Sequence, residues 1–436
     1  MKYLYKIIVV LYLIVGIVPN FDALDKVTTQ WLYLNCLNTI FLILLIAKDY
    51  PLKKFFLHKT TILFFCLFLW SLVSLLFAIN PIESVVVLSQ IFAIVIGFIV
   101  IMVCVTEIEK PFNFISNVIS IFLILELTKI YFPFSEFEIA KSKIFGRSFL
   151  FLGFAANVNI TAFSIIYKIP FFIYSIFKLK KFKYLTTLIA FIVFFLIAFA
   201  AGTLNSTRGA ILTYSSLVPI LIIISIVIYK KTKESRILVL SIIYTAAVLT
   251  SFSLNRYLSN SIGTSDRSIT NRISSLNALL DDDKNVDESI NQRQNFYSQA
   301  FNTIIKNPIF GVGIGNWKIK SVDTNKENII GYIVPYHVHN DYLEIGTEIG
   351  LVGLAIYLAI LFFAFKETIL NFLKMIFTKA KLEENYFEYI SIALFFYIYI
   401  IDSNLNFPFH RPIVLINLVV LISYLNRVKI EYPNGK

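Results

Sequence analysis

Long apolar runs recur along almost the whole chain, and they limit its fold more strongly than any other feature. A helix needs roughly 20 mostly apolar residues to cross a bilayer, and twelve stretches meet or approach that requirement. They cover residues 3–19, 31–47, 60–79, 84–106, 112–131, 152–177, 184–203, 209–229, 236–253, 341–365, 386–401 and 412–425. Only 15% of the residues are charged, against about 25% in soluble proteins, which excludes soluble, disordered and coiled-coil classes. The sequence predicts an all-α polytopic membrane protein with about twelve transmembrane helices.

The spacing of the apolar runs divides the chain into three parts. Residues 1–253 hold the first nine predicted spans, residues 254–339 form one long loop, and residues 340–436 hold the last three spans. A loop of that length among short connections is a functional candidate. Within it, a capping box at Ser289 to Gln292 predicts a helix that stops at Asn307-Pro308.

The placement of lysine and arginine predicts the orientation. With a cytoplasmic N-terminus, the cytoplasmic segments hold 22 basic residues and the short loops on the opposite side hold 6. Because cytoplasmic loops are enriched in lysine and arginine, we expect both termini in the cytoplasm and the long loop on the opposite side of the membrane. The net charge of +12 is then mainly an orientation signal, and no nucleic-acid partner is expected.

Histidines and carboxylates gather where the long loop meets the tenth predicted span. His337 and His339 precede this span, and a histidine at a membrane boundary is well placed for proton transfer. The pair is weak evidence for a metal site, because no cysteine lies nearby. Asp341, Glu344 and Glu348 follow on one helical face, and carboxylates in apolar surroundings are functional candidates.

Several other charged residues need partners. Arg293 falls on the apolar stripe of the predicted loop helix, where an unpaired arginine is costly. Arg208 lies on the same side of the membrane, just before the eighth span. A structural ion pair for Arg293 and snorkelling for Arg208 explain these residues as well as an anionic substrate does. Glu126, Lys129 and Lys168 fall inside predicted spans, where a mutual pair and a substrate path are both open.

Glycines mark two places where backbones approach closely. Residues 311–315 (GVGIG) lack the surrounding βαβ unit of a dinucleotide-binding loop. They predict a turn whose backbone comes close to a ligand or another helix. Gly346, Gly350 and Gly353 in the tenth span are expected to permit close helix packing.

Three motifs in order resemble the signatures of the O-antigen ligase superfamily, which also includes O-antigen polymerases and some protein O-oligosaccharyltransferases. They are residues 205–210 (NSTRGA), 307–316 (NPIFGVGIGN) and 339–353 (HNDYLEIGTEIGLVG). A further, weaker pattern begins at Arg147 and continues to Asn157-Val158-Asn159, where the family usually has proline in the middle position. Asn406-Phe407-Pro408 and Arg411-Pro412, near the C-terminus, fit looser family habits.

The resemblance implies transfer of a glycan from undecaprenyl diphosphate to an acceptor hydroxyl at the periplasmic face, without a metal or other cofactor. By motif, His339 is the expected catalytic base or orienting group, and Arg208 and Arg293 are expected to bind the diphosphate. We keep as secondary candidates Arg147, His337, Asp341, Glu344 and Glu348. The expected partners are the lipid-linked donor, a glycan acceptor and membrane lipids.

Three functions, and besides them a structural assembly role that would not require His339, stay open on the sequence. The first is an O-antigen ligase whose acceptor is lipid A-core. The second is a polymerase that extends the chain on its lipid carrier, which the motifs cannot separate from a ligase. The third is a transporter or flippase for a lipid-linked or anionic substrate, although the two halves of the chain show no convincing internal repeat.

Overall fold

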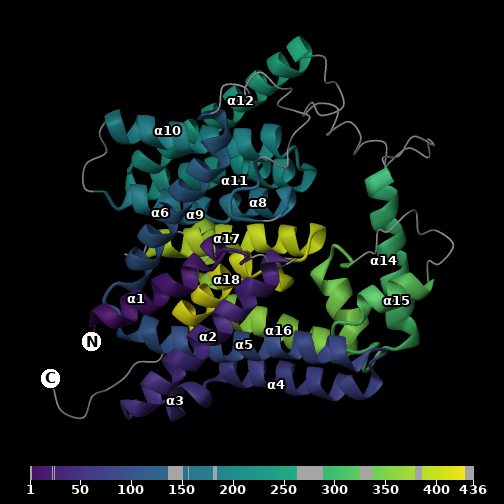
Figure 1. Cartoon of the computed structure of the whole chain (residues 1–436). Helices are drawn as coiled ribbons and strands as arrows, with labels where there is room; N and C mark the ends of the chain where they lie inside the picture. Colours follow the sequence, from purple (N-terminus) through teal and green to yellow (C-terminus); the bar gives the residue numbers. More distant parts are fainter. Residues whose placement is uncertain are drawn as a thin grey trace. The chain divides into compact units, whose positions relative to one another are not determined.

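The computed structural model describes residues 2–21, 23, 25–135, 151–155, 157–179, 184–262, 288–324, 336–378 and 385–427. These residues form helices joined by turns, and no strand occurs among them (Figure 1). The bounds are α1 Lys2–Leu13, η1 Ile14–Ile17, α2 Lys26–Ala47, α3 Lys53–Phe56, α4 Lys59–Ser74, η2 Leu75–Phe77, α5 Pro81–Glu107, α6 Pro111–Tyr131, η3 Phe132–Ser135, α8 Val158–Ile166, α9 Ile169–Phe177, α10 Tyr184–Phe199, η6 Ala200–Leu204, α11 Arg208–Thr232, α12 Arg236–Ile262, α14 Glu288–Lys306, α15 Trp317–Thr324, α16 Asp341–Phe377, α17 Tyr386–Leu405, η8 Pro408–His410 and α18 Pro412–Leu425. The predicted all-α class is confirmed.

The helices fall where the apolar runs predict them. In the described part of the chain, ten helical stretches are long and apolar enough to cross a membrane, and they coincide with predicted spans two to eleven. Two shorter apolar helices, Tyr3–Ile17 and Pro412–Leu425, coincide with the first and twelfth. The chain is therefore a multi-pass membrane protein. Its orientation, and the division of the chain at residues 253 and 339, stay predictions.

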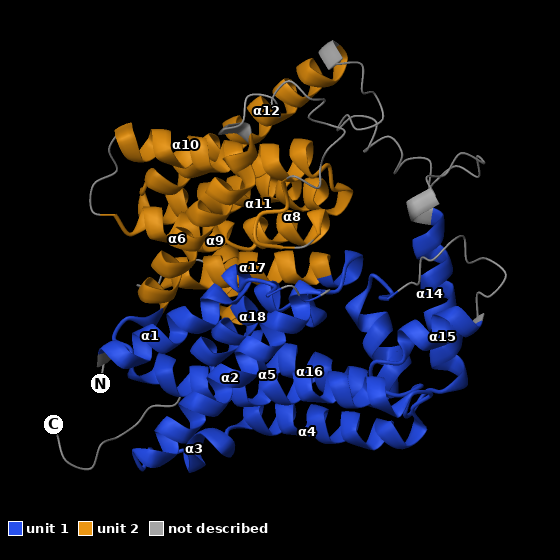
Figure 2. Cartoon of the chain, in the orientation of Figure 1, with its two compact units in different colours: residues 1–111, 288–367, 403–436 blue, residues 112–287, 368–402 orange. Residues whose placement is uncertain are grey.

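The chain forms two compact units (Figure 2). Unit 1, in blue, contains Met1–Pro111, Glu288–Glu367 and Ser403–Lys436. Unit 2, in orange, contains Phe112–Asp287 and Thr368–Asp402. His337, His339 and Arg293 thus belong to unit 1, whereas Arg208 belongs to unit 2.

In unit 1, α5 is the central helix. Every residue from Ala93 to Val105 is buried, as expected for a helix that is apolar on all sides. Helices α1, α2, α4 and α18 pack around it. Asn38 of α2 adds a polar link, because it accepts a hydrogen bond from the Tyr12 hydroxyl (2.6 Å) and donates one to the Ala93 carbonyl of α5 (2.8 Å).

Unit 2 contains a paired buried charge at a break between α8 and α9. Lys168 lies in the break, and its Nζ donates to Glu126 Oε2 (2.7 Å) and to the carbonyl of Ser164 (2.8 Å). Pro170, in the first turn of α9, has no N–H to continue the helix across this point. The structure therefore satisfies Lys168 and Glu126 mutually, in agreement with the structural-pair alternative.

A second break interrupts α16 and holds the glycine-rich turn. Ile349 and Gly350 leave the helical conformation, and Gly350 has φ +71°. The carbonyls of Thr347 and Glu348 accept the N–H groups of Val312 (3.0 Å) and Gly313 (2.9 Å). The expectation of a close backbone approach in the turn is confirmed. The role of Gly350 differs from the expected one, since it allows a chain break as well as close packing.

A Cβ atom at Gly350 would lie 2.0 Å from the carbonyl oxygen of Ile309. We therefore expect Gly350→Ala to destabilise the protein by about 1–3 kcal/mol, the usual cost of a strained backbone position, measured as a lower Tm of the full chain in detergent. Gly346→Ala is the control on the same helix, because its Cβ would meet side chains alone, the nearest atom being the end of Ile304 at 3.0 Å. Equal Tm values for the two variants would contradict the role assigned to the break.

Candidate functional site

The segment before α16 adopts a sharp turn at His339. Asn340 caps the helix, since its Oδ1 accepts the N–H of Leu343 at 3.0 Å, as expected for asparagine at this position. Val338 is fully buried against Ala300 of α14 and Trp317 of α15. Between these two anchors, His339 has φ +62°, a conformation that residues other than glycine rarely adopt and that is common at functional sites.

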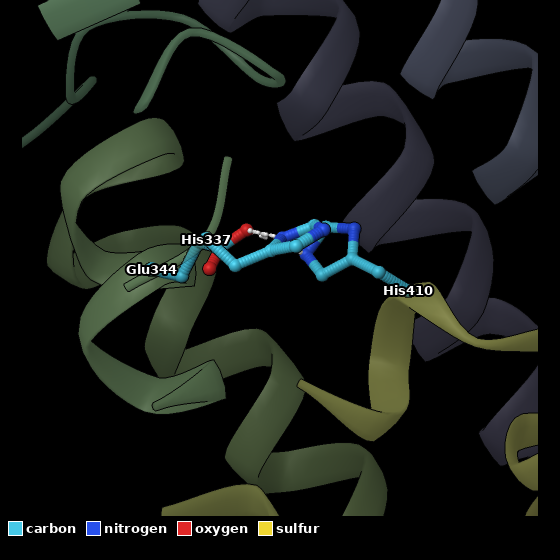
Figure 3. Close-up of side chains that lie close together, drawn as sticks. All are labelled: His337, Glu344 and His410. Atoms are coloured by element: carbon cyan, nitrogen blue, oxygen red, sulfur yellow. Dashed lines mark hydrogen bonds and ion pairs between the residues drawn. The ribbon is translucent and has the colours of Figure 1, made fainter. Parts of the chain in front are cut away.

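Glu344 joins this segment to the turn before α18. Its Oε1 lies 2.8 Å from Nδ1 of His337 and 3.1 Å from Nε2 of His410, and its Oε2 accepts the N–H of Val338 at 2.8 Å. Figure 3 shows the three side chains of this group, which we call the Glu344 cluster: His337, Glu344 and His410. Three of the four histidines in the sequence are His337, His339 and His410, so the structure gathers most of the chain's imidazoles around this helix end.

The charges within the Glu344 cluster follow from its contacts. Burial disfavours the charged form of both imidazoles. For His410 the Glu344 carboxylate outweighs burial and raises the pKa to about 9, whereas for His337 burial prevails and lowers the pKa. At neutral pH we therefore assign an imidazolium at His410 and a neutral imidazole at His337. Because a carboxylate can only accept hydrogen bonds, Nδ1 of His337 carries the hydrogen.

The same three side chains offer the donor atoms of a metal site, and these atoms lie within 4.8 Å of one another. Two imidazoles and one carboxylate are ligands that zinc accepts. However, Glu344 already accepts hydrogen bonds from His337 and from the N–H of Val338, both at 2.8 Å, and its Oε1 lies at ion-pair distance, 3.1 Å, from Nε2 of His410. We treat the cluster as a hydrogen-bonded ion pair that positions the His337–His339 segment.

His339 lies next to this cluster in an environment that keeps its imidazole neutral. Burial, and after it the charge of Arg293, lowers the pKa of His339 to about 4. Its Nδ1 is buried and has no hydrogen-bond partner in the described structure. The Tyr297 hydroxyl contacts the backbone carbonyls of His339 (3.0 Å) and Asn404 (3.1 Å). A neutral imidazole with an unused nitrogen can accept a proton from a bound hydroxyl.

Arg293 comes from α14, where it is partly buried. Its charge adds to the effect of burial in lowering the pKa of His339, and it opposes the rise that burial causes in the pKa of Tyr297. The structure thus brings together two residues that the sequence motifs single out separately. In such an arrangement the guanidinium can bind an anionic group, and the neutral imidazole can accept a proton from a hydroxyl beside that group.

Asp341 and Glu348 accept hydrogen bonds from the backbone of neighbouring elements. Asp341 is fully buried, and its Oδ2 accepts the N–H of Phe409 in η8 at 3.1 Å. Glu348 accepts the N–H of Trp317, at the start of α15, at 3.0 Å. A carboxylate at a helix N-terminus satisfies a free N–H group and interacts favourably with the helix dipole. These contacts give both carboxylates structural roles.

The remaining candidates lie elsewhere. Arg208 begins α11 in unit 2, directly after the turn at Ser206, which has φ +52°. The π-helical η6 ends α10 just before this turn, and its Thr203 hydroxyl accepts a hydrogen bond from Asn255 at 3.2 Å. Arg147 lies outside the described residues. The diphosphate-binding role of Arg208 stays a prediction.

Sequence reasoning missed His410, and it gave Phe407 no role beyond its place in a loose family motif. The Phe407 ring stacks on His337 (centroids 3.9 Å apart) and meets the His339 ring edge-on (5.1 Å). One signal was available: the stretch between the last two predicted spans contains a histidine and an arginine in a chain with only four histidines. Nothing local indicates that this stretch meets His337.

Comparison with known proteins agrees with this description. Residues 192–358 match the family described as O-antigen ligase, so this segment of the membrane protein is similar to that family. Over 104 residues it is 35% identical to a Rickettsia conorii protein named "Putative polysaccharide ligase". That match spans 23% of this chain and 23% of the relative. The segment matched by the family contains Arg208, Arg293 and His339, but neither Arg147 nor His410.

Proposed function

We propose that this protein transfers a glycan from undecaprenyl diphosphate to an acceptor hydroxyl at the periplasmic face of a bacterial inner membrane, as an O-antigen ligase whose acceptor is lipid A-core. The observation that carries the proposal is His339, a partly buried neutral imidazole whose buried Nδ1 has no partner in the described structure and which feels the charge of Arg293. The proposed chemistry requires no metal ion.

The proposed reaction is a displacement at the sugar carbon that bears the diphosphate. The acceptor oxygen forms a bond to this carbon as its proton passes to His339, and the bond from the carbon to the diphosphate oxygen breaks. Negative charge develops on the leaving diphosphate. Arg293 is placed to stabilise that charge, because a planar guanidinium binds phosphate oxygens in a bidentate manner. Arg208 keeps the same predicted role on the strength of its motif.

A polymerase that extends the lipid-linked chain would use the same residues and remains the second candidate. A transporter or flippase gains less support, because Glu126 and Lys168, the buried charges that favoured it, are paired with each other. The two enzymatic candidates differ only in the acceptor that they use.

The product of the reaction tests the proposal. The purified full chain is supplied with a lipid-linked glycan repeat, and either lipid A-core or a second lipid-linked repeat is added as acceptor. Glycan attached to lipid A-core is the expected product. A longer chain on the lipid carrier would identify a polymerase, and the absence of any product with both acceptors would contradict glycan transfer.

A further inference from the structure

Arg411 lies in the turn between η8 and α18, and it has a charge that the described structure does not neutralise. Its guanidinium lies over the Phe407 ring, with Cζ 4.4 Å from the ring centroid. Its Nε is buried and has no hydrogen-bond partner among the described residues. No carboxylate in the described part of the chain comes within ion-pair distance of it.

The two carboxylates that act on the pKa of Arg411, Asp25 and Glu344, already have other partners. Burial lowers the pKa of Arg411 to about 10, against the opposing influence of Asp25 and Glu344, so the side chain is still a cation at neutral pH. Asp25 accepts the N–H of Val27 at 3.0 Å as the cap of α2, and Glu344 is shared by His337 and His410. A partly buried guanidinium without a counter-ion is costly, and this cost favours an anionic ligand.

The position of Arg411 indicates which anion it binds. The Phe407 ring contacts the guanidinium of Arg411 and the rings of His337 and His339. The charge of Arg411 also lowers the pKa of His339, as that of Arg293 does. His339 is therefore influenced by two guanidinium groups, one from α14 and one from the turn before α18, both within unit 1.

We propose that Arg411 binds a phosphate group of the diphosphate substrate, together with Arg293 and next to His339. This assignment deepens the proposed function and rests on it for the source of the diphosphate. Stacking on Phe407 fixes the plane of the guanidinium, and a fixed plane presents two N–H groups to two phosphate oxygens. A lysine at this position would supply a charge but no planar pair of donors.

Binding of inorganic pyrophosphate to the purified full chain in detergent tests the assignment without a transfer assay. Hydrogen bonds to charged groups contribute enough to affinity that Arg411→Gln is expected to raise the Kd for pyrophosphate about tenfold or more. Arg411→Lys is expected to weaken binding several-fold and less than Arg411→Gln does. Should Arg411→Gln not fold, the Lys variant alone decides, and an unchanged Kd in it overturns the proposal.

Arg427→Gln is the matched control. Arg427 also lies over an aromatic ring, with Cζ 4.4 Å from the Tyr424 centroid, at the opposite end of α18. Its loss is expected to leave the Kd for pyrophosphate unchanged, and a loss of affinity equal to that of Arg411→Gln would overturn the proposal by showing a general charge effect.

Three further results would also overturn the proposal. They are equal affinity of wild type and Arg411→Gln, no pyrophosphate binding by wild type, and binding of glycerol 3-phosphate as tight as that of pyrophosphate. The last result would assign Arg411 to lipid headgroups. If pyrophosphate binding depends on Arg411 but wild type transfers no glycan, the proposed function fails and the diphosphate site stands.

Discussion

Replacing His339 with alanine is expected to reduce the rate of glycan transfer by about 100-fold or more, the usual contribution of a general base. The imidazole of His339 is the proton acceptor in the proposed reaction, since its Nδ1 is free and its lowered pKa leaves the ring unprotonated at neutral pH. Initial rates of the purified variant with lipid-linked donor and acceptor measure the effect. The Tm should change little, because no described hydrogen bond to the His339 ring is lost.

His58→Ala is the matched control, since His58 is the histidine outside this region and caps α4 through the N–H of Thr60. Its rate should stay close to that of wild type.

The pH profile gives a second check. A base with a pKa of about 4 is deprotonated at neutral pH and becomes protonated as the pH falls through that value. The rate of transfer should therefore persist at pH 5 and fall near pH 4. A fall in the rate at the ordinary histidine pKa would contradict the assignment, and so would a wild-type rate in His339→Ala.

Replacing Glu344 with alanine is expected to destabilise unit 1 by about 3–5 kcal/mol, the cost of leaving a buried charge without its partner. The carboxylate is 2% exposed and is shared by His337, His410 and the N–H of Val338. Its loss leaves the His410 imidazolium buried and frees the segment that carries His339. We expect both the Tm and the rate of transfer to fall, the rate because His339 is no longer held in place.

Glu344→Gln separates charge from geometry. Its amide oxygen can still accept the N–H of Val338, but it cannot balance the charge on His410. In wild type the pKa of His410 is raised to about 9, above its ordinary value of about 6.5. The ion pair therefore contributes fully below pH 6.5, and this contribution is lost as the pH rises through about 9. That loss of stability should be absent in Glu344→Gln. If the stability of this variant depends on pH as that of wild type does, the pairing of Glu344 with His410 is refuted.

The pair of Glu83 with Lys318, 2.6 Å apart, supplies the control for Glu344, because its side chains are 31% and 24% exposed and solvent reaches both. Ion pairs that solvent reaches contribute about 0–1 kcal/mol, so Glu83→Gln should have little effect on the Tm. A Glu344→Ala variant as stable and as active as Glu83→Gln would show that the Glu344 cluster does not position His339.

The sequence by itself determined where the helices lie. A bilayer requires a minimum apolar length, so the runs of the sequence coincide with the helices that the structure forms. Local signals placed α14 as well, because the helix predicted to begin near Ser289 and to stop at Asn307-Pro308 is found at Glu288–Lys306. The resemblance singled out His339 and Arg293 from ordered motifs. Each of these inferences depends on residues close together in the chain.

Only the tertiary structure decided what surrounds His339. The Glu344 cluster depends on His410, which two helices, α16 and α17, separate from His337. Gly350 breaks α16 because a distant turn supplies the N–H groups of Val312 and Gly313 to the carbonyls that the break frees. Helical periodicity arises from neighbours in sequence, whereas burial, the charge of Arg411 and the pKa of His339 arise from neighbours in space. The chain therefore predicts its spans locally, and the chemistry of its site follows from how those spans pack.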